Sequence, residues 1–424
     1  MEYQAPSVNL VRIYWQMPNG MRASKMVPMK QYMKEEFSIH LCTGAFFSPI
    51  CYNYLIEGCG EIDQHVVMKP DRSTFKVLPW CPTQAAVMID IYDHHDQPWK
   101  YCPRSLLKKA AKDLKEKHDL ELKIGFEIEF AIFNLDFEPV EFNGYCNSNS
   151  LDLYSKILED IHLNLEALDI EVLVIHKETG SGQYEIVLGY GEVLETLDKY
   201  FMARETIKAV LRKYSLLCSF IPKSGPITQN GAHVHMSLWK DGKNITVDKN
   251  REHQLSEVAN SYIAGLLKGL PALISLIAPT YNGMKRLMPS ASVGAVIAWG
   301  VENKEAPLRY MAMQSNFELK TMDHTANHYY ALATIMNLGS NGIIDKLTLG
   351  EPLPAVPKMR DFHLLPSRWE DVEEYVQKDA SGTYLKKSID EELLDILMKM
   401  RKYDIEHYFK LSLPEEVKEL TVRY

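Results

Sequence analysis

Three short segments place charged or imidazole side chains at alternate positions, the spacing that puts them on one face of a β-strand. They are Glu127-Ile128-Glu129, His233-Val234-His235 and Glu318-Leu319-Lys320. Residues i and i+2 of a strand lie about 6.6–7 Å apart on the same face. Each pair alone is better explained by an exposed strand edge or a hydrogen-bonded histidine pair. Together, the three pairs favour one shared site on a sheet.

Two further glutamates, Glu185 and Glu192, lie in the apolar segment "GSGQYEIVLGYGE". Residues seven apart in a regular strand point to opposite faces. Gly189 and Gly191 permit a bulge or bend between them. We therefore expect Glu192 to return to the side of Glu185, so that both contact one metal ion.

Clustered carboxylates need cations, because two carboxylates about 4 Å apart repel by about 4 kcal/mol at an effective dielectric constant near 20. Oxygen-rich ligands favour Mg²⁺ or Mn²⁺, and one imidazole adds tolerance for Mn²⁺. Two metal ions about 3.5–4 Å apart would explain so many carboxylates. Such sites commonly act on phosphates, and "NGMKRLMPS" and "ENKEAPLR" add Lys285, Arg286, Lys304 and Arg309 as candidate phosphate or carboxylate ligands. All four could be surface charges, and for Lys285 and Lys304 taken singly that reading is equally good.

Strand and helix patterns predict how these residues are positioned. The first hundred residues read as short strands and turns, and Pro103 begins a helix. Strands are expected at 122–133, 170–178, 182–190 and 231–239, with helices at 154–168 and 194–214. This pattern predicts a small β-rich domain over 1–102 and a larger α/β domain over 103–424.

Composition narrows the classes of function. The 424 residues carry a formal net charge of -9, which does not favour a nucleic-acid partner or a membrane surface. We see no apolar run near the roughly 18 residues that span a bilayer and no signal peptide. Seven cysteines without a CxxC pair predict reduced thiols in a cytoplasmic protein. Neither a GxxxxGK[ST] loop nor a convincing GxGxxG motif is present.

Five ordered motifs resemble the glutamine synthetase superfamily, of the bacterial type I kind. They are "GFEIEF", "HKETGSGQYEI", "FIPKSGP…NGAHVHMSL", "APTYNGMKRLMP" and "ENKEAPLR…NFELKTMDHTANHYYALA". The resemblance implies an α+β fold, with a β-grasp-like N-terminal domain and a catalytic domain built on a curved antiparallel sheet. It also implies a homododecamer of two stacked hexameric rings. Family chemistry uses ATP to phosphorylate the side-chain carboxylate of glutamate, and an amine then displaces phosphate.

The resemblance assigns roles residue by residue. It implies that Glu129, Glu185 and Glu192 bind one divalent ion and that Glu127, His233 and Glu318 bind a second, with two or three Mg²⁺ or Mn²⁺ ions per site. It implies that Arg286, Lys320, His233 and Ser292 contact the substrates. It places Glu178, His235, Ser237 and Arg309 beside ATP. Arg286, Lys304 and Arg309 are the implied catalytic cations.

Four departures from the family pattern concern the amine and phosphate sites. The loop that carries an ammonium-binding aspartate in the family reads "CTGAFFSPICYNY", and the first aspartate of the chain is Asp63. A glutamate that completes the ammonium pocket is replaced by Ser292, and two arginines are replaced by Lys304 and Lys320. Lysine keeps the charge but loses the bidentate fork.

Loss of both acidic groups predicts a ligase that joins glutamate, or a close relative, to an organic monoamine. Phe46, Phe47, Ile50, Tyr52 and Tyr54 could wall an amine pocket, or could equally be core of the N-terminal domain. Three alternatives stay open. The chain could be a catalytically silent relative, a true ammonium-using glutamine synthetase, or a kinase-like enzyme with no amine step.

Overall fold

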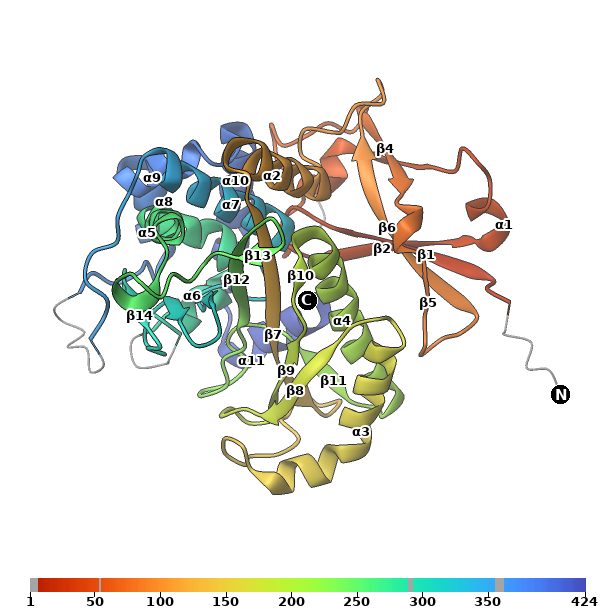
Figure 1. The fold of residues 1–424 in the computed structure, drawn as a ribbon. Coiled ribbons are helices and arrows are strands. Elements are labelled where there is room, and N and C mark those ends of the chain that lie inside the picture. Colours follow the sequence, from red (N-terminus) through yellow and green to blue (C-terminus); the bar gives the residue numbers. More distant parts are fainter. Residues whose placement is uncertain (1–6, 53–54, 289–292, 355–361) are drawn as a thin grey trace.

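The computed structural model describes residues 7–52, 55–288, 293–354 and 362–424. Two sheets organise this part of the chain (Figure 1). The N-terminal sheet has the order β2-β1-β6-β4-β3, with β5 paired to β6. Its strands are β1 (Leu10–Gln16), β2 (Arg22–Pro28), β3 (Ile39–Cys42), β4 (His65–Pro70), β5 (Lys76–Val77) and β6 (Gln84–Tyr92). The contact between β1 and β6 is parallel, and the other pairings are antiparallel.

The second sheet carries two of the alternating pairs in full and Glu318 of the third. Its order is β14-β15-β16-β12-β7-β9-β8, with β10 and β11 also paired to β7 and β13 paired to β12. The strands are β7 (Glu121–Phe133), β8 (Val172–Lys177), β9 (Gln183–Leu188), β10 (Gly191–Glu192), β11 (Leu217–Ser219), β12 (Ala232–Lys240), β13 (Lys243–Asn244), β14 (Trp299–Val301), β15 (Leu308–Met311) and β16 (Asn316–Leu319). Only β14 and β15 pair in parallel among these described strands. The predicted antiparallel sheet is therefore confirmed apart from this edge.

Helices cover the sheets and fill the C-terminal part. They are α1 (Met29–Tyr32), α2 (Pro103–His118), α3 (Ser148–Glu166), α4 (Val193–Lys213), α5 (Glu257–Ile277), α6 (Tyr281–Arg286), α7 (His328–Ile344), α8 (Trp369–Lys378), α9 (Ala380–Lys386), α10 (Glu391–Tyr408) and α11 (Leu413–Arg423). Short 3₁₀ turns are η1 (Thr43–Phe47), η2 (Arg72–Thr74) and η3 (Glu252–Gln254). Pro103 is the first residue of α2, as its fixed φ favours. The division at residues 102 and 103 stays a proposal.

Helix α5 corrects one expectation from composition. Its 21 residues reach a mean hydropathy of 1.3 over an 18-residue window, which is enough by length and composition for a membrane span. However, 78% of that window is buried, and α5 packs along α7 inside the protein. A helix that is apolar all round is also what a protein core requires.

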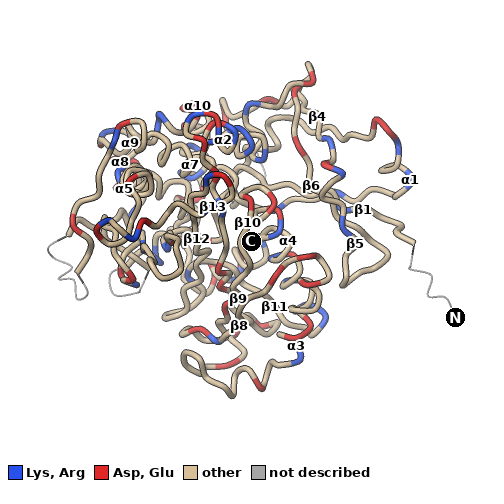
Figure 2. Tube along the Cα trace, in the orientation of Figure 1, with Lys and Arg blue, Asp and Glu red and all other residues tan. Residues whose placement is uncertain are grey.

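The acidic and basic residues are interspersed along the trace (Figure 2), and all seven cysteines are free, as predicted.

Helix α4 buries the basic side chain of Lys208, and this burial predicts that the stability of the protein depends on pH. Lys208 is 9% exposed. Burial, followed by the nearby charge of Arg22, lowers the pKa of Lys208 to about 7. Between about pH 7 and 10.5, Lys208 therefore carries a proton in the unfolded chain but not in the folded protein. Because the unfolded state binds this extra proton, the free energy of unfolding rises by about 1.4 kcal/mol per pH unit across that range. We expect Lys208→Met to stabilise the protein at pH 7 by a few kcal/mol and to remove this slope.

Denaturant unfolding of both proteins at several pH values measures the effect. The matched control is Lys213→Met, on the same helix but exposed, and it should leave the slope unchanged. A Lys208→Met variant with the same pH slope as the native protein would contradict the prediction.

Candidate active site

Strand β7 is the centre of the candidate site because it pairs on both sides with strands that carry polar side chains. Its apolar residues Phe126, Ile128 and Phe130 are buried and alternate with Glu127 and Glu129. In the register, Glu127 lies opposite His233 of β12, and Glu129 lies opposite Glu185 of β9. Antiparallel partners in direct register have Cβ atoms about 4.5–5.5 Å apart. The sheet therefore collects these side chains into one array.

The array continues outward onto the neighbouring strands. Glu318 of β16 lies opposite His235 of β12, and Arg309 of β15 lies opposite Glu318. On the other side, His176 of β8 lies opposite Glu185. Three groups of side chains each bring their ligand atoms within 4.8 Å of one another: Glu127, His233 and Glu318; Glu129, Glu185 and His233; and His176, Glu178 and Glu185. Shared members join the groups into one continuous cluster.

His233 is the hub of this cluster. Its Nδ1 lies 3.0 Å from Glu127 Oε2 and 3.4 Å from Glu318 Oε1, and its Nε2 lies 3.9 Å from Glu129 Oε1. Arg286 Nη2 lies 3.1 Å from His233 Nε2. A guanidinium only donates hydrogen bonds, so Nε2 accepts and Nδ1 faces the carboxylates. Arg286 thereby sets the orientation of the imidazole.

Burial and mutual repulsion perturb the carboxylates. Burial, reinforced by the charges of Glu127 and Glu129, raises the pKa of Glu185 to about 10. Burial also raises the pKa of Glu129. The pKa of Glu127 is lowered instead, because its hydrogen bonds with His233 and His235 outweigh the effect of its burial. The cluster cannot keep all of its carboxylates ionised unless positive charge compensates them. A bound multivalent cation would supply that charge.

Gly231 shows how tightly the cluster is built. A Cβ atom at this position would lie 2.4 Å from both Arg286 Nη2 and His233 Nε2. The backbone N–H of Gly231 donates to Glu129 Oε2. Only glycine allows the backbone to approach this closely, so we infer that this residue, to which the sequence analysis gave no role, helps to place Glu129.

The residues fit divalent metal ions. The donor set is carboxylate oxygen with one imidazole per group, the chemistry preferred by Mg²⁺ and Mn²⁺. Two buried polar atoms, His176 Nδ1 and Glu318 Oε2, have no hydrogen-bond partner among the described residues. Glu318 Oε2 does lie 3.0 Å from Arg309 Nη1, without hydrogen-bond geometry. The unpartnered His176 Nδ1, next to clustered carboxylates, supports a cation here.

The structure does not bring Glu192 to this cluster. Glu192 pairs with Lys123 of β7, six residues before Glu129, whose partner is Glu185. Six strand residues span about 20 Å. The Glu192 side chain is 57% exposed and its Oε1 lies 4.0 Å from Lys123 Nζ. The expected bend at the glycines does put Glu192 on the same face of the sheet as Glu185. However, the separation along the strand keeps the two glutamates apart.

Glu178 and His176 occupy the place expected of Glu192. His176 Nε2 lies 3.0 Å from Glu178 Oε1 and 3.8 Å from Glu185 Oε1. The charge of Glu178 also contributes to the raised pKa of Glu129. The sequence held a signal for this, because "HKE" is another i, i+2 pair, and the hairpin of β8 and β9 turns it toward Glu185. The family resemblance placed Glu178 beside ATP and gave no role to His176.

A cavity of about 370 Å³ opens beside Glu127 and His235. Its walls combine Leu173, Val174, Val187 and Tyr190 with the polar residues Ser237, Asn244 and Asn316. His235 Nε2 lies 3.0 Å from Glu127 Oε1, and its Nδ1 lies 3.1 Å from Asn316 Oδ1. Two residues predicted to contact ATP, His235 and Ser237, thus line one cavity next to the cluster, whereas Glu178 is not among its lining residues.

The predicted cationic residues differ in whether they contact the carboxylate cluster. Arg309 lies on the cluster through Glu318. Arg286 is 1% exposed, and it donates to His233 and to the carbonyls of Lys320 and Thr321. Lys304 is exposed in the turn between β14 and β15, and no contact within the described residues joins it to the cluster. Lys320 is buried directly after β16, and Ser292 lies outside the described residues.

The candidate amine-pocket residues are mostly core. Phe46 and Phe47 are at most 1% exposed and pack on Trp99. Ile50 is buried in a second cluster with Tyr408 and residues of α11. Tyr52 is 48% exposed, and Tyr54 lies outside the described residues. Phe46, Phe47 and Ile50 therefore serve the packing of their own chain.

Comparison with known proteins identifies the family. The family model described as "Glutamine synthetase, catalytic domain" matches residues 100–420. The chain belongs to the glutamine synthetase family. It is 30% identical over 422 residues to type-1 glutamine synthetase 1 of Dictyostelium discoideum, covering 91% of this chain and 83% of that protein. It is 31% identical over 392 residues to the glutamine synthetase of Methanococcus voltae, covering 88% and 86%.

Solved structures confirm the fold predicted for a glutamine synthetase. A crystal structure of a glutamine synthase homologue superposes with a TM-score of 0.87 at 23% identity, covering 100% of both chains. GmaS without ligand superposes with a TM-score of 0.84 at 22% identity, covering 96% of this chain and 94% of that one. As a member of this family, the protein is an ATP-dependent ligase that uses small-molecule substrates and divalent metal ions.

Proposed function

We propose that this glutamine synthetase relative joins glutamate to an organic monoamine through a γ-glutamyl phosphate intermediate. The observation that carries the proposal is a contrast. Carboxylates and histidines lie in three groups that could hold metal ions, whereas the two acidic positions expected around ammonium are a loop without carboxylates and Ser292. A small cation such as ammonium needs compact negative charge, and an amine with apolar substituents does not.

The proposed reaction has two displacements. The γ-carboxylate oxygen of glutamate attacks the γ-phosphorus of ATP, which breaks the bond to the bridging oxygen and releases ADP. The neutral amine nitrogen then attacks the acyl carbon, phosphate leaves, and the nitrogen loses a proton. Divalent ions held by the cluster would neutralise the charge of the transferred phosphoryl group.

The chain's own residues have supporting roles in this scheme. The cavity at His235 and Ser237 has apolar walls suited to a nucleotide base and opens toward Glu127. Arg309 adds positive charge at Glu318, where a transferred phosphoryl group would gain most from it. Arg286 orients His233, and its contact with a substrate carboxylate stays a prediction. A cytoplasmic location and a double-ring dodecamer also stay proposals.

Ammonium is the second candidate substrate, because the curated relatives carry the name glutamine synthetase. Phosphate release with ATP, glutamate and Mg²⁺ over a panel of amines separates the two. We expect kcat/KM for the best alkyl or aryl monoamine to exceed that for ammonium by at least about tenfold, which corresponds to about 1.4 kcal/mol. Putrescine should rank below the monoamines, since its second ammonium group would lack a carboxylate partner.

Turnover with ammonium that equals or exceeds turnover with every organic amine would refute the proposal. A matched pair of variants tests its cause. Ser292→Glu should shift the preference toward ammonium, because it restores the missing negative charge, whereas Ser290→Glu, two positions earlier, should not. ATP turnover with glutamate alone, giving a stable phosphorylated product, would instead indicate the kinase-like alternative.

A further inference from the structure

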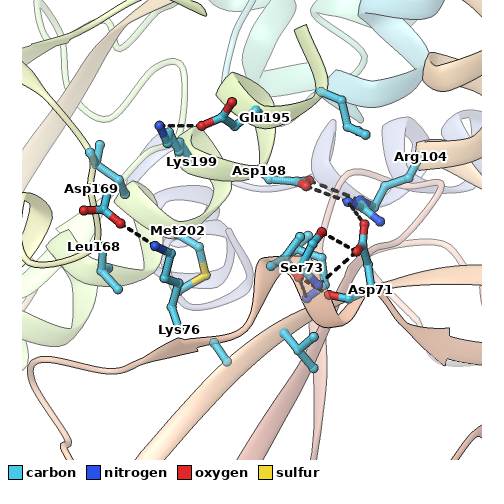
Figure 3. Close-up of a pocket in the computed structure, with 16 residues that line it drawn as sticks. Asp71, Ser73, Lys76, Arg104, Leu168, Asp169, Glu195, Asp198, Lys199 and Met202 are labelled. Atoms are coloured by element: carbon cyan, nitrogen blue, oxygen red, sulfur yellow. Dashed lines mark hydrogen bonds and ion pairs between the residues drawn. The ribbon is translucent and has the colours of Figure 1, made fainter. Parts of the chain in front are cut away.

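A second cavity, away from the metal cluster, lies between the N-terminal sheet and helix α4. Its volume is about 420 Å³, which is within the range of small-molecule sites. One wall comes from η2, β5 and β6, and the opposite wall comes from α4 and residues 168–170 (Figure 3). It shares no lining residue with the cavity at Glu127. A ligand bound here would contact both halves of the fold.

The body of this cavity is apolar. Strand β6 contributes Val87 and Met88, the segment after α3 contributes Leu168 and Ile170, and α4 contributes Leu194 and Met202. Leu194 and Met202 are only partly buried, although both are apolar. Open apolar surface of this kind gains about 25 cal/mol per Å² when a ligand covers it. The occupant should therefore carry a hydrocarbon portion.

The charged residues at the rim of the cavity carry more negative than positive charge. Four carboxylates line the cavity, Asp71, Asp169, Glu195 and Asp198, against three cations, Lys76, Arg104 and Lys199. All three cations are already paired: Lys76 with Asp169, Lys199 with Glu195, and Arg104 with both Asp71 and Asp198. Arg104 also holds Asp90, behind the lining. The excess charge is negative and gathers around Arg104, where Figure 3 shows Asp71 and Asp198 each paired with the guanidinium.

We propose that this cavity binds a small organic ammonium ion, with its hydrocarbon portion on Met88 and Met202 and its charge at Asp71 and Asp198. An anion would meet the excess of carboxylates and find every lining cation occupied. A neutral apolar molecule would leave the negative rim uncompensated. Asp71 remains accessible, with a side chain that is 23% exposed. The site goes beyond the proposed function, and its ligand needs neither ATP nor metal to bind.

Binding to the whole protein, in EDTA and without nucleotide, tests the proposal. The probes are n-butylammonium, n-butyrate and 1-butanol, which share an alkyl chain and differ in charge. Isothermal titration should give an affinity for n-butylammonium at least tenfold higher than for the other two. A crystal soaked with 4-bromobenzylammonium should show the bromine anomalous signal between Met88 and Met202.

Variants separate this cavity from the candidate active site. Leu194→Trp should fill the cavity and reduce n-butylammonium affinity at least tenfold, and Met202→Trp provides a second filled variant in case the first fails to fold. Leu163→Trp is the matched control, since Leu163 is 49% exposed on α3 and lies outside the lining. Arg286→Ala, at the metal cluster, should retain binding.

Equal affinity for n-butyrate, unchanged affinity in both filled variants, or bromine found only at the metal cluster would overturn the proposal. Failure of the amine ligase reaction would not affect this result, because the titration involves no turnover. Conversely, a cavity that binds no amine would leave the ligase proposal intact.

Discussion

Replacing Glu178 with glutamine should lower metal-dependent ligase turnover by two orders of magnitude or more, whereas replacing Glu192 with glutamine should change it by less than about twofold. Glu178 lies within 4.8 Å, ligand atom to ligand atom, of His176 and the buried Glu185. Glu192 pairs with Lys123, about 20 Å along the strand from the partner of Glu185. Glutamine preserves the shape of each side chain and removes only its charge.

Phosphate release at several Mn²⁺ concentrations measures both variants. Glu178→Gln should also need more Mn²⁺ for half-maximal turnover, because it removes one anionic donor from the cluster. Thermal unfolding in EDTA checks that each variant is folded. A large loss in Glu192→Gln together with near-native turnover in Glu178→Gln would restore the ligand set that the family resemblance implies.

Replacing Arg104 with methionine should destabilise the protein by about 3–5 kcal/mol, the largest stability effect that we expect from a single charge removal here. The Arg104 side chain is 4% exposed, and its donors lie 2.8 Å from Asp90 Oδ1, 2.7 Å from Asp198 Oδ2 and 3.0 Å from Asp71 Oδ2. Removing the guanidinium leaves three carboxylates close together without their common partner. These carboxylates come from the N-terminal sheet region and α4, so the two parts of the fold lose a link.

Denaturant unfolding at neutral pH measures this loss. Arg104→Lys should fall between the native protein and Arg104→Met, because lysine keeps the charge but cannot form the fork. Lys112→Met, on the same helix with a side chain that is 72% exposed, should change stability by less than about 0.5 kcal/mol. A change below 1 kcal/mol in Arg104→Met would show that the carboxylates are well solvated without it.

Local patterns in the sequence are enough to predict the parts of the site that lie within single strands. Alternation predicts that Glu127 with Glu129 and His233 with His235 share strand faces, and β7 and β12 hold them so. Period-two alternation is a property of the strand backbone itself, so no tertiary information is needed. The order of the motifs along the chain likewise predicts the family and its fold.

Tertiary structure decided which strands meet and at what register. The sequence groups Glu192 with Glu185 because both lie in one segment, but sheet register places Glu178 and His176 there instead. Register depends on pairing between distant segments, which local spacing does not contain. The same reason applies to Phe46 and Phe47, where apolar side chains fit a pocket or a core equally well until packing on Trp99 assigns them to the core. Arg286 is an orienting partner of His233 only because Gly231 lets the two side chains meet.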